Sequence, residues 1–91
     1  MYLIKQARSY KKSLKRIAAS GNKNVLEEIK EVTRKLSEGN SLGEKYKDHR
    51  LEGGLRHYRE CHIKPDILLI YRVNENDLIL ADIGSHSQLF G

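Results

Sequence analysis

The chain has 91 residues, of which 17 are Lys or Arg and 12 are Asp or Glu, so its net charge is +5 and its pI about 9.4. This length allows one domain, residues 1–91, with one modest core, and it excludes a second domain. The basic balance favours an anionic partner such as nucleic acid or an acidic protein, although a mildly basic soluble surface would show the same balance.

The cysteine content and the hydropathy of the chain argue against a secreted, disulfide-bonded protein and against a membrane protein. The single cysteine, Cys61, cannot form an internal disulfide, and Met1 to Lys15 lacks the apolar run of about seven residues that a signal peptide needs. We therefore expect a cytoplasmic protein. The longest apolar run, Ile67 to Tyr71, has the size of a buried strand and falls far below the ~18 residues of a transmembrane helix, so no membrane role is expected.

The N-terminal half predicts a short strand and two amphipathic helices. Met1 to Lys5 alternates weakly, as a first strand would. Ser9 is the expected cap of a helix that continues to about Ser20 and stops at Gly21; its predicted apolar face comprises Tyr10, Leu14, Ile17 and Ala18. A second helix is predicted from about Asn24 to Glu38, before Gly39-Asn40, with an apolar stripe of Val25, Ile29, Val32 and Leu36.

The C-terminal half predicts two hairpins and a tail. The first hairpin joins Tyr46–Leu51 to Leu55–Ile63 through a turn at Gly53-Gly54, and Pro65-Asp66 forms the next turn. The second joins Ile67–Val73, apolar enough to be central, to Leu78–Ile83, and His86–Phe90 is a short tail of about one helical turn. The expected fold is α+β, of order β-α-α-β-β-β-β: two helices cover one face of a mostly antiparallel sheet of four to five strands, and the other face is available for a ligand.

All four histidines, His49, His57, His62 and His86, lie in this half, together with Asp66 and several cations. Imidazole and carboxylate groups near a phosphate suit cleavage of RNA: a base takes the proton of the ribose 2′-hydroxyl and an acid protonates the leaving 5′-oxygen. A zinc site is disfavoured because adjacent Cys61 and His62 point to opposite faces of a strand. For the same reason Cys61 fits a small core residue better than a nucleophile, and each histidine taken singly also fits a surface or core-edge position.

Two blocks carry a resemblance to a known family: Tyr58 to Tyr71, which reads YRECHIKPDILLIY, and Gly84 to Phe90, which reads GSHSQLF. With Lys47-Asp48-His49 and Leu51-Glu52-Gly53-Gly54, they resemble the YafQ branch of the RelE/ParE toxin superfamily. The resemblance is dense in the C-terminal half, whereas the N-terminal half agrees only in its pattern of two helices after a short strand.

The resemblance implies a RelE-like fold and a bacterial type II toxin. Such a toxin is an endoribonuclease, or mRNA interferase, that enters the ribosomal A site and cuts mRNA during translation without a metal or other cofactor. The implied partners are a cognate antitoxin of the DinJ/RelB kind, the ribosome and mRNA, with operator DNA bound only through the antitoxin complex.

The match to the family motif also implies roles for single residues. His49, His62, Asp66 and His86 fall on the catalytic positions, and Phe90 on the aromatic that places or stacks the substrate. We expect His86 to be the general acid, Asp66 or His49 to be the base, and His62 to position the phosphate. Further positive charge at the substrate is expected from Lys47, Arg56 and Arg59.

Two positions depart from the family pattern. The family commonly has an arginine two residues before the glycine of its GSH motif, where this chain has Asp82, and some relatives have an aromatic residue where this chain has Ile67. A carboxylate at position 82 would repel the phosphate if it pointed inward. Two alternatives stay open: a non-enzymatic, ParE-like toxin that binds a protein target, and a catalytically weakened protein retained for antitoxin and operator binding. Only the second is supported by Asp82.

Overall fold

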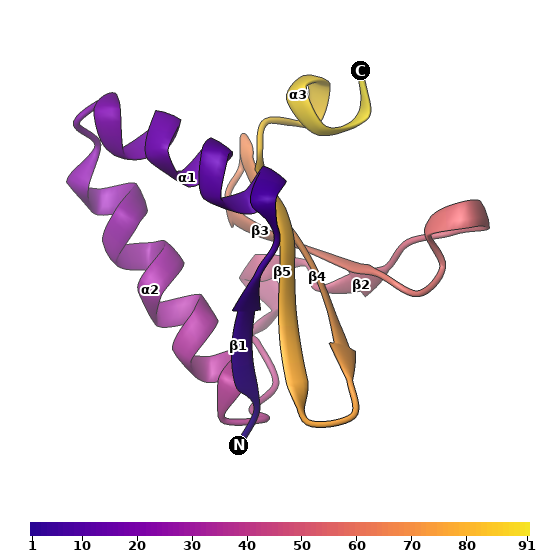
Figure 1. Ribbon diagram of the computed structural model, residues 1–91. Helices are drawn as coiled ribbons and strands as arrows, with labels where there is room; N and C mark the ends of the chain where they lie inside the picture. Colours follow the sequence, from indigo (N-terminus) through magenta and orange to yellow (C-terminus); the bar gives the residue numbers. More distant parts are fainter.

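The computed structural model describes residues 1–91. The chain forms one five-stranded sheet, and the helices α1 and α2 lie on one of its faces (Figure 1). The elements are β1 (Leu3–Gln6), α1 (Arg8–Ala19), α2 (Lys23–Ser37), η1 (Glu44–Tyr46), β2 (His49–Arg50), η2 (Gly53–Leu55), β3 (Arg59–Lys64), β4 (Ile67–Asn74), β5 (Asp77–Gly84) and α3 (His86–Phe90). The strand order is β1-β5-β4-β3-β2, in which only β1 and β5 are parallel. The predicted α+β fold is confirmed. None of the helices has the length and apolar character that crossing a membrane requires.

The start of α1 differs from the prediction that Ser9 caps it. The N-cap is Ala7, which has no side-chain cap, and the hydroxyl of Ser9 donates instead to the backbone oxygen of Ala81, at 2.6 Å. The Ala7 N–H is already bonded to the Leu80 carbonyl oxygen, so the chain passes from β1 directly into the helix. The start of α1 is thus fixed to β5 rather than capped by its own side chain.

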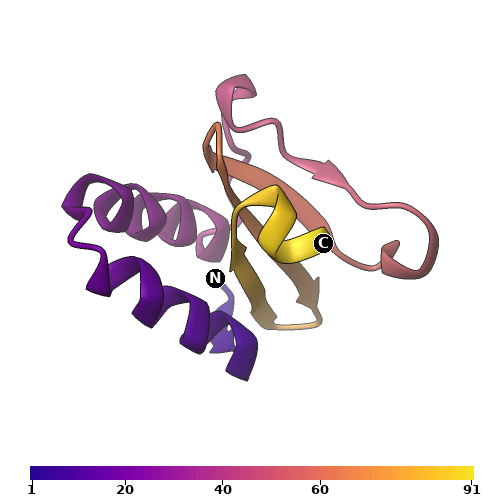
Figure 2. The same ribbon diagram turned by 90° about the horizontal axis from the view of Figure 1, so that it is seen from above.

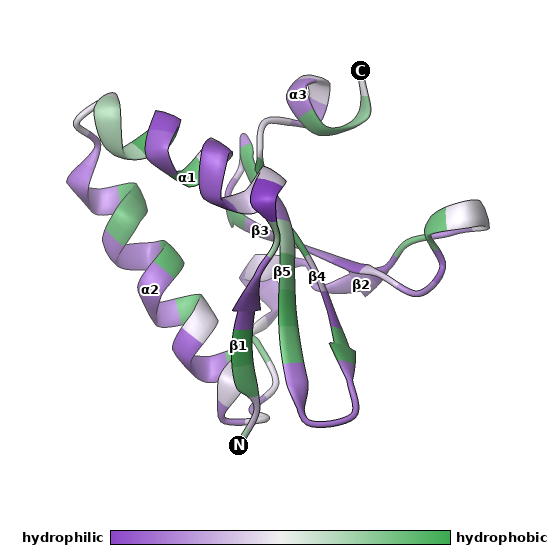
Figure 3. Cartoon of the chain, viewed as in Figure 1, coloured by the Kyte–Doolittle hydropathy of each residue, from purple (hydrophilic) through white to green (hydrophobic).

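The core lies between the helices and the sheet. The predicted stripe of α2 is buried in full: Val25, Ile29, Val32 and Leu36. On α1, Tyr10 is buried and Leu14 and Ile17 are partly buried, but Ala18 is exposed, because the second half of α1 projects past the sheet (Figure 1). In Figure 3, β5 is mostly hydrophobic along its length, and α1 and α2 beside the sheet alternate hydrophobic and hydrophilic stretches.

The first predicted hairpin is mostly irregular, so that prediction was wrong in its extent. Only His49–Arg50 forms a strand, because Tyr46 turns into the core, where its hydroxyl donates to Glu28 of α2, and Lys47 adopts a left-handed backbone, with φ at 49°. The turn is wider than two residues and includes η2. His57 therefore lies in an exposed turn and not on β3.

The alternation of β3 separates the two faces of the sheet. Cys61 is fully buried in the helix-side core, whereas His62 is partly exposed on the opposite side, which we call the open face. The strand β4 lies at the centre of the sheet, as predicted. Viewed from above, the helices α1 and α2 lie together on one side, and α3 lies over the end of the sheet (Figure 2).

A bulge in β5 changes which residues face the core. Leu80 pairs with Tyr71, but the next pair is Asp82 with Ile70, so Ala81 is the extra residue. In a regular strand, residues two apart share a face, so Asp82 would lie on the helix-side face with Leu80. Because of the bulge, Ile83 takes that core position instead and pairs with Leu69. In the last part of β5, immediately before α3, the side chains that face the core are therefore shifted by one residue.

Candidate functional site

Three of the predicted catalytic residues line one cavity of about 510 Å³ at the end of the sheet. His62 comes from β3, Asp66 from the turn between β3 and β4, and His86 is the first residue of α3. The remaining wall is formed by Pro65, Leu68, Ser85 and Ser87. The cavity thus brings two imidazoles and a carboxylate from separate segments into one space.

The helix α3 is held by a reciprocal cap. The hydroxyl of Ser85 accepts the backbone N–H of Gln88 at 3.2 Å, and the side-chain oxygen of Gln88 accepts the backbone N–H of Ser85 at 2.8 Å. The ring of Phe90 lies one turn further, with its centroid 5.0 Å from that of His86. The cap fixes the direction in which His86 leaves the strand, and Phe90 covers one side of its ring.

Glu60 joins the fourth predicted residue, His49, to this group. Glu60 is only 7% exposed, and its two carboxylate oxygens lie 3.7 Å from Nε2 of His49 and 3.5 Å from Nε2 of His62. His49 is opposite Glu60 in the β2–β3 register, and His62 is two residues further along β3. A buried carboxylate thus lies between two imidazoles, and it can hold both rings when they carry a proton.

Sequence reasoning did not select Glu60. The signal for it was present, because Glu60 and His62 are two residues apart on one strand and so share a face. The contact with His49 could not be read in the same way, since it depends on the register of a strand only two residues long.

The hydrogen bonding of His49 determines which ring nitrogen is free. Its Nδ1 lies 2.7 Å from the backbone oxygen of Lys47, and a carbonyl oxygen can only accept, so Nδ1 carries a hydrogen. Nε2, the other ring nitrogen, faces the carboxylate of Glu60. The Lys47 carbonyl thus fixes the orientation of the His49 ring, with Nε2 toward the buried carboxylate of Glu60.

The three predicted cations have different surroundings. Lys47 lines a second cavity of about 340 Å³, which it shares with His62, Lys45 and Lys64. Arg56 is exposed after η2 and makes no ion pair. Of the three, only Lys47 lies in a cavity that His62 also lines.

Arg59 differs from the other two cations because it is bound within the protein. Its Nε donates to Asp48 at 3.2 Å, and Asp48 also accepts the hydroxyl of Tyr71 at 2.6 Å. Burial opposes the charge of Arg59, but the hydrogen bonds with Asp48 and Tyr71 outweigh it, and the pKa of Arg59 is raised.

The two departures from the family pattern have structural explanations. Oδ1 of Asp82 accepts the hydroxyl of Ser13, at 2.7 Å, and the backbone N–H of Ile83, at 2.8 Å, so the carboxylate is engaged by α1. Asp82 does not line the cavity of His62 and His86. Ile67 is partly buried and packs against the core cluster.

The structure gives no sign of a reactive thiol at Cys61 or of a metal-binding cluster. Burial, with smaller contributions from Asp48 and Glu60, raises the pKa of the Cys61 thiol to about 12, so the group is neutral near pH 7. No group of three or more His, Cys, Asp or Glu side chains is placed to hold a metal ion.

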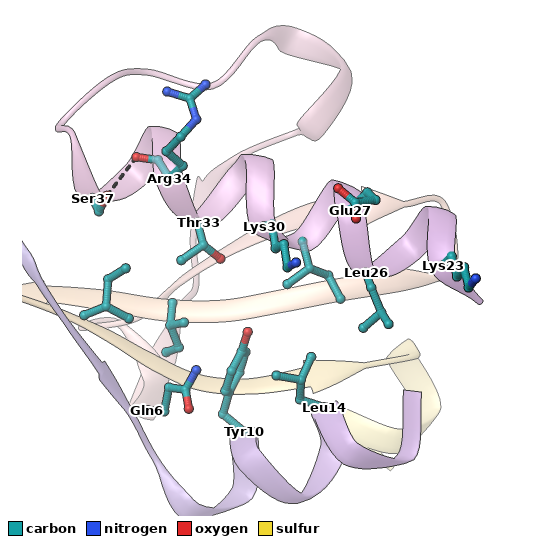
Figure 4. A pocket seen from close by; sticks show the side chains of 13 residues that line it. Gln6, Tyr10, Leu14, Lys23, Leu26, Glu27, Lys30, Thr33, Arg34 and Ser37 are labelled. Carbon is teal, nitrogen blue, oxygen red and sulfur yellow. Dashed lines mark hydrogen bonds between the residues drawn. The ribbon is translucent and has the colours of Figure 1, made fainter. Parts of the chain in front are cut away.

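The largest cavity lies elsewhere, between α1, α2 and the helix-side face of the sheet (Figure 4). It measures about 550 Å³, and apolar side chains such as Tyr10, Leu14 and Leu26 project into it. None of the predicted catalytic residues lines it. The predicted catalytic side chains and this cavity thus lie in different parts of the molecule.

Comparisons with known proteins agree with this architecture. The mRNA interferase toxin YafQ of Escherichia coli K12 is 44% identical over 46 residues, a segment that covers 50% of this chain and 50% of the relative. The chain therefore matches about half the length of this curated relative. The crystal structure of a metal-bound toxin from Helicobacter pylori is 41% identical, with a TM-score of 0.91, covering 99% of this chain and 100% of that one.

A second solved structure, the DinJ–YafQ toxin–antitoxin complex of E. coli, contains a chain that is 30% identical, with a TM-score of 0.88 and coverage of 99% and 98%. The sequence model of the family described as "Bacterial toxin of type II toxin-antitoxin system, YafQ" matches residues 2–91. The chain belongs to the YafQ family of bacterial type II toxins.

Proposed function

We propose that this protein is a toxin that cleaves mRNA on the ribosome, by attack of the ribose 2′-hydroxyl on the adjacent phosphate. The observation that carries the proposal is the cavity of about 510 Å³ lined by His62, Asp66 and His86. Groups able to donate and accept protons there surround a space of suitable size for a phosphodiester, which is what acid–base cleavage of RNA requires. The curated E. coli relative is named an mRNA interferase.

We propose one role for each side chain, and its position in the structure supports that role. His86, exposed on α3 and covered on one side by Phe90, is the general acid for the 5′-oxygen. Asp66 is the first candidate for the base because it shares the cavity with His86, whereas Nε2 of His49 is directed at Glu60. His62, beside Glu60, holds the phosphate when its ring is protonated.

The exposure of the site supports the proposed dependence on the ribosome. His86, His49 and Asp66 are all exposed, so water reaches each of them in the free protein. Catalytic groups gain strength when water is excluded, and binding in the ribosomal A site would exclude it. The net charge of +5 supports binding to ribosomal RNA through several phosphates, which would weaken steeply with salt.

Inhibition by an antitoxin of the DinJ/RelB kind completes the proposal. The E. coli structure is a complex of a YafQ toxin with DinJ, and its toxin chain has this fold. An acidic segment that folds on this basic protein would block it, and operator DNA would be bound only through that complex.

The test is a map of mRNA 5′ ends in a bacterial cell-free translation reaction, with wild-type protein beside His86→Ala. New ends that require translating ribosomes and disappear in the variant would support a ribosome-dependent endoribonuclease. If the folded wild-type protein creates no new ends, the enzymatic proposal fails, and a toxin that binds a protein target or a catalytically weakened member replaces it.

A further inference from the structure

The open face carries a second group of RNA-compatible side chains beyond the cavity. The strand register places Lys5 of β1 beside Ile79 of β5, and Ile79 beside Arg72 of β4. The guanidinium of Arg72 lies over the ring of Tyr58, 5.7 Å from its centroid. The backbone N–H of Leu51 bonds to the carbonyl oxygen of Tyr58, which completes a row across the sheet.

This row is on the same face of the sheet as Glu60 and His62. Residues two apart on a strand share a face, and Tyr58, Glu60 and His62 follow this spacing. Arg72 likewise shares the face of Ile70, which pairs with Glu60. Four residues of extended chain span about 13 Å, so Tyr58 is farther from His62 than one nucleotide but on the same continuous surface.

The charges in the row are free to bind a ligand. Arg72 and Lys5 take part in none of the ion pairs of the protein, whereas Arg34 is paired with Glu31 and Glu38, and Arg59 with Asp48. Lys5 is exposed, and both Tyr58 and Arg72 are partly exposed. The row therefore offers two cations that take part in no ion pair, and one of them, Arg72, lies over an aromatic ring.

We propose that Tyr58, Arg72 and Lys5 form a nucleotide subsite for the single-stranded RNA whose cleavage is proposed above. A base stacks on the Tyr58 ring or on the Arg72 guanidinium plane, and the flanking phosphate binds Arg72 and Lys5. Aromatic rings on an open sheet face, interleaved with cations, are a common way to bind single-stranded RNA without reading much sequence. The inference rests on the proposed function only for the identity of the RNA as mRNA.

Binding is tested without cleavage, on the full chain, with a short RNA oligonucleotide whose 2′-hydroxyls are all methylated. Such an oligonucleotide cannot be cut by 2′-hydroxyl attack, so its binding is read independently of catalysis. Its titration into isotope-labelled protein should shift the backbone amide signals of Tyr58, Arg72 and Lys5. The signal of Lys12, an exposed lysine on α1 that lies on the other side of the sheet, should stay unchanged.

Two variants separate stacking from charge. Tyr58→Leu should weaken binding of the oligonucleotide roughly tenfold. Arg72→Gln should reduce the slope of log Kd against log salt by about 0.7, the value for one phosphate contact on a single strand. Lys12→Gln removes the same charge as Arg72→Gln and should change neither quantity beyond a small general effect. Circular dichroism confirms that each variant is folded.

Every outcome separates this inference from the proposed function. Oligonucleotide binding that depends on Tyr58 and Arg72, from a protein that cuts no mRNA, supports the subsite and overturns the enzymatic proposal. Cleavage of mRNA by a protein whose oligonucleotide binding is unchanged in Tyr58→Leu and Arg72→Gln overturns the subsite alone. Shifts of the three signals with an acidic peptide and none with excess RNA would also overturn it, and would identify the row as a protein-binding surface.

Discussion

The hydroxyl of Ser13 on α1 donates a hydrogen bond to Oδ1 of Asp82 on β5, at 2.7 Å, and Arg16 in turn donates to that hydroxyl at 3.2 Å. Ser13 is buried, and Asp82 stands where the family commonly has an arginine. The carboxylate therefore has a structural partner in the helical layer, and its negative charge is held away from the cavity of His62 and His86.

This contact gives the first prediction. Ser13→Ala and Asp82→Ala should each lower the free energy of unfolding by about 1 kcal/mol, because each leaves a partly buried polar group without its partner. The double variant should cost little more than either single one, since the same hydrogen bond is lost in all three. Urea unfolding of the wild type, the two single variants and the double variant measures this coupling between Ser13 and Asp82. Additive losses would mean that the two side chains act independently.

Glu60 gives the second prediction. Glu60→Gln removes the charge shared by His49 and His62 while keeping the shape, so ribosome-dependent cleavage should fall on the order of 100-fold. Urea unfolding should change little, because an isosteric neutral group remains.

The matched control for this variant is Glu27→Gln, which alters an exposed glutamate of α2 on the opposite side of the sheet. It should cleave as the wild type does. If Glu60→Gln also cleaves at the wild-type rate, Glu60 has no part in the site.

Gly84 gives the third prediction. A Cβ added at this position would lie 2.8 Å from the side-chain oxygen of Gln88, which caps α3. Gly84→Ala should displace that amide, loosen the first turn of α3 and move His86. A displacement of about 1 Å can reduce catalysis by up to ~100-fold, so cleavage should fall far more than stability does.

Gln88→Ala should reproduce the effect of Gly84→Ala, because it removes the same cap. Gly43→Ala is the control: Gly43 has an ordinary φ of −66° and nothing within 4 Å of an added Cβ. For all three variants, mRNA cleavage and urea unfolding are measured on the same samples, so that a loss of activity can be compared with any loss of stability. Wild-type cleavage by Gly84→Ala would show that the position of His86 does not depend on this cap.

Cys61 gives the fourth prediction. Burial raises the pKa of its thiol from 9.0 to about 12, so above pH 9 the unfolded chain releases this proton while the folded chain keeps it. The stabilisation is therefore complete below pH 9 and is lost as the pH rises toward 12, at up to about 1.4 kcal/mol per pH unit. Between pH 9 and 10, Cys61→Ala should lose stability less steeply than the wild type.

Urea unfolding at pH 7, 9 and 10 tests this slope. At pH 7 the variant should be less stable by about 1 kcal/mol, because a small buried side chain is shortened. A thiol reagent should react with native Cys61 only as fast as the protein opens. Parallel losses of stability in both proteins from pH 9 to 10 would contradict the assignment.

The helices and the central strands were predictable because their signals are local. The stripe of Val25, Ile29, Val32 and Leu36 has helical spacing over a whole element, and the apolar run from Ile67 defines β4. The first hairpin was not predictable in extent: Tyr46 leaves the strand for a contact with Glu28, a residue far away in the sequence. Ser9 failed as a helix cap for a similar reason, since its partner is Ala81.

The site was only partly accessible to the same reasoning. The opposite directions of Cys61 and His62 follow from strand alternation alone, and the structure confirms them. The orientation of Asp82 depends on the bulge at Ala81, and strict alternation from Leu80 would have placed it in the core. The catalytic roles of His49, His62, Asp66 and His86 remain predictions, now with a shared cavity for three of them.

The end of β5 has one further consequence. β1 stops at Gln6, opposite Leu80, whereas β5 continues to Gly84, and side chains of α1 bond to Ala81 and Asp82 where a neighbouring strand would otherwise lie. An uncovered strand edge invites pairing with another chain, and here a helix closes it. A partner protein that extends the sheet must therefore add its strand at β1 or β2, the two outer strands, away from the edge that leads to His86.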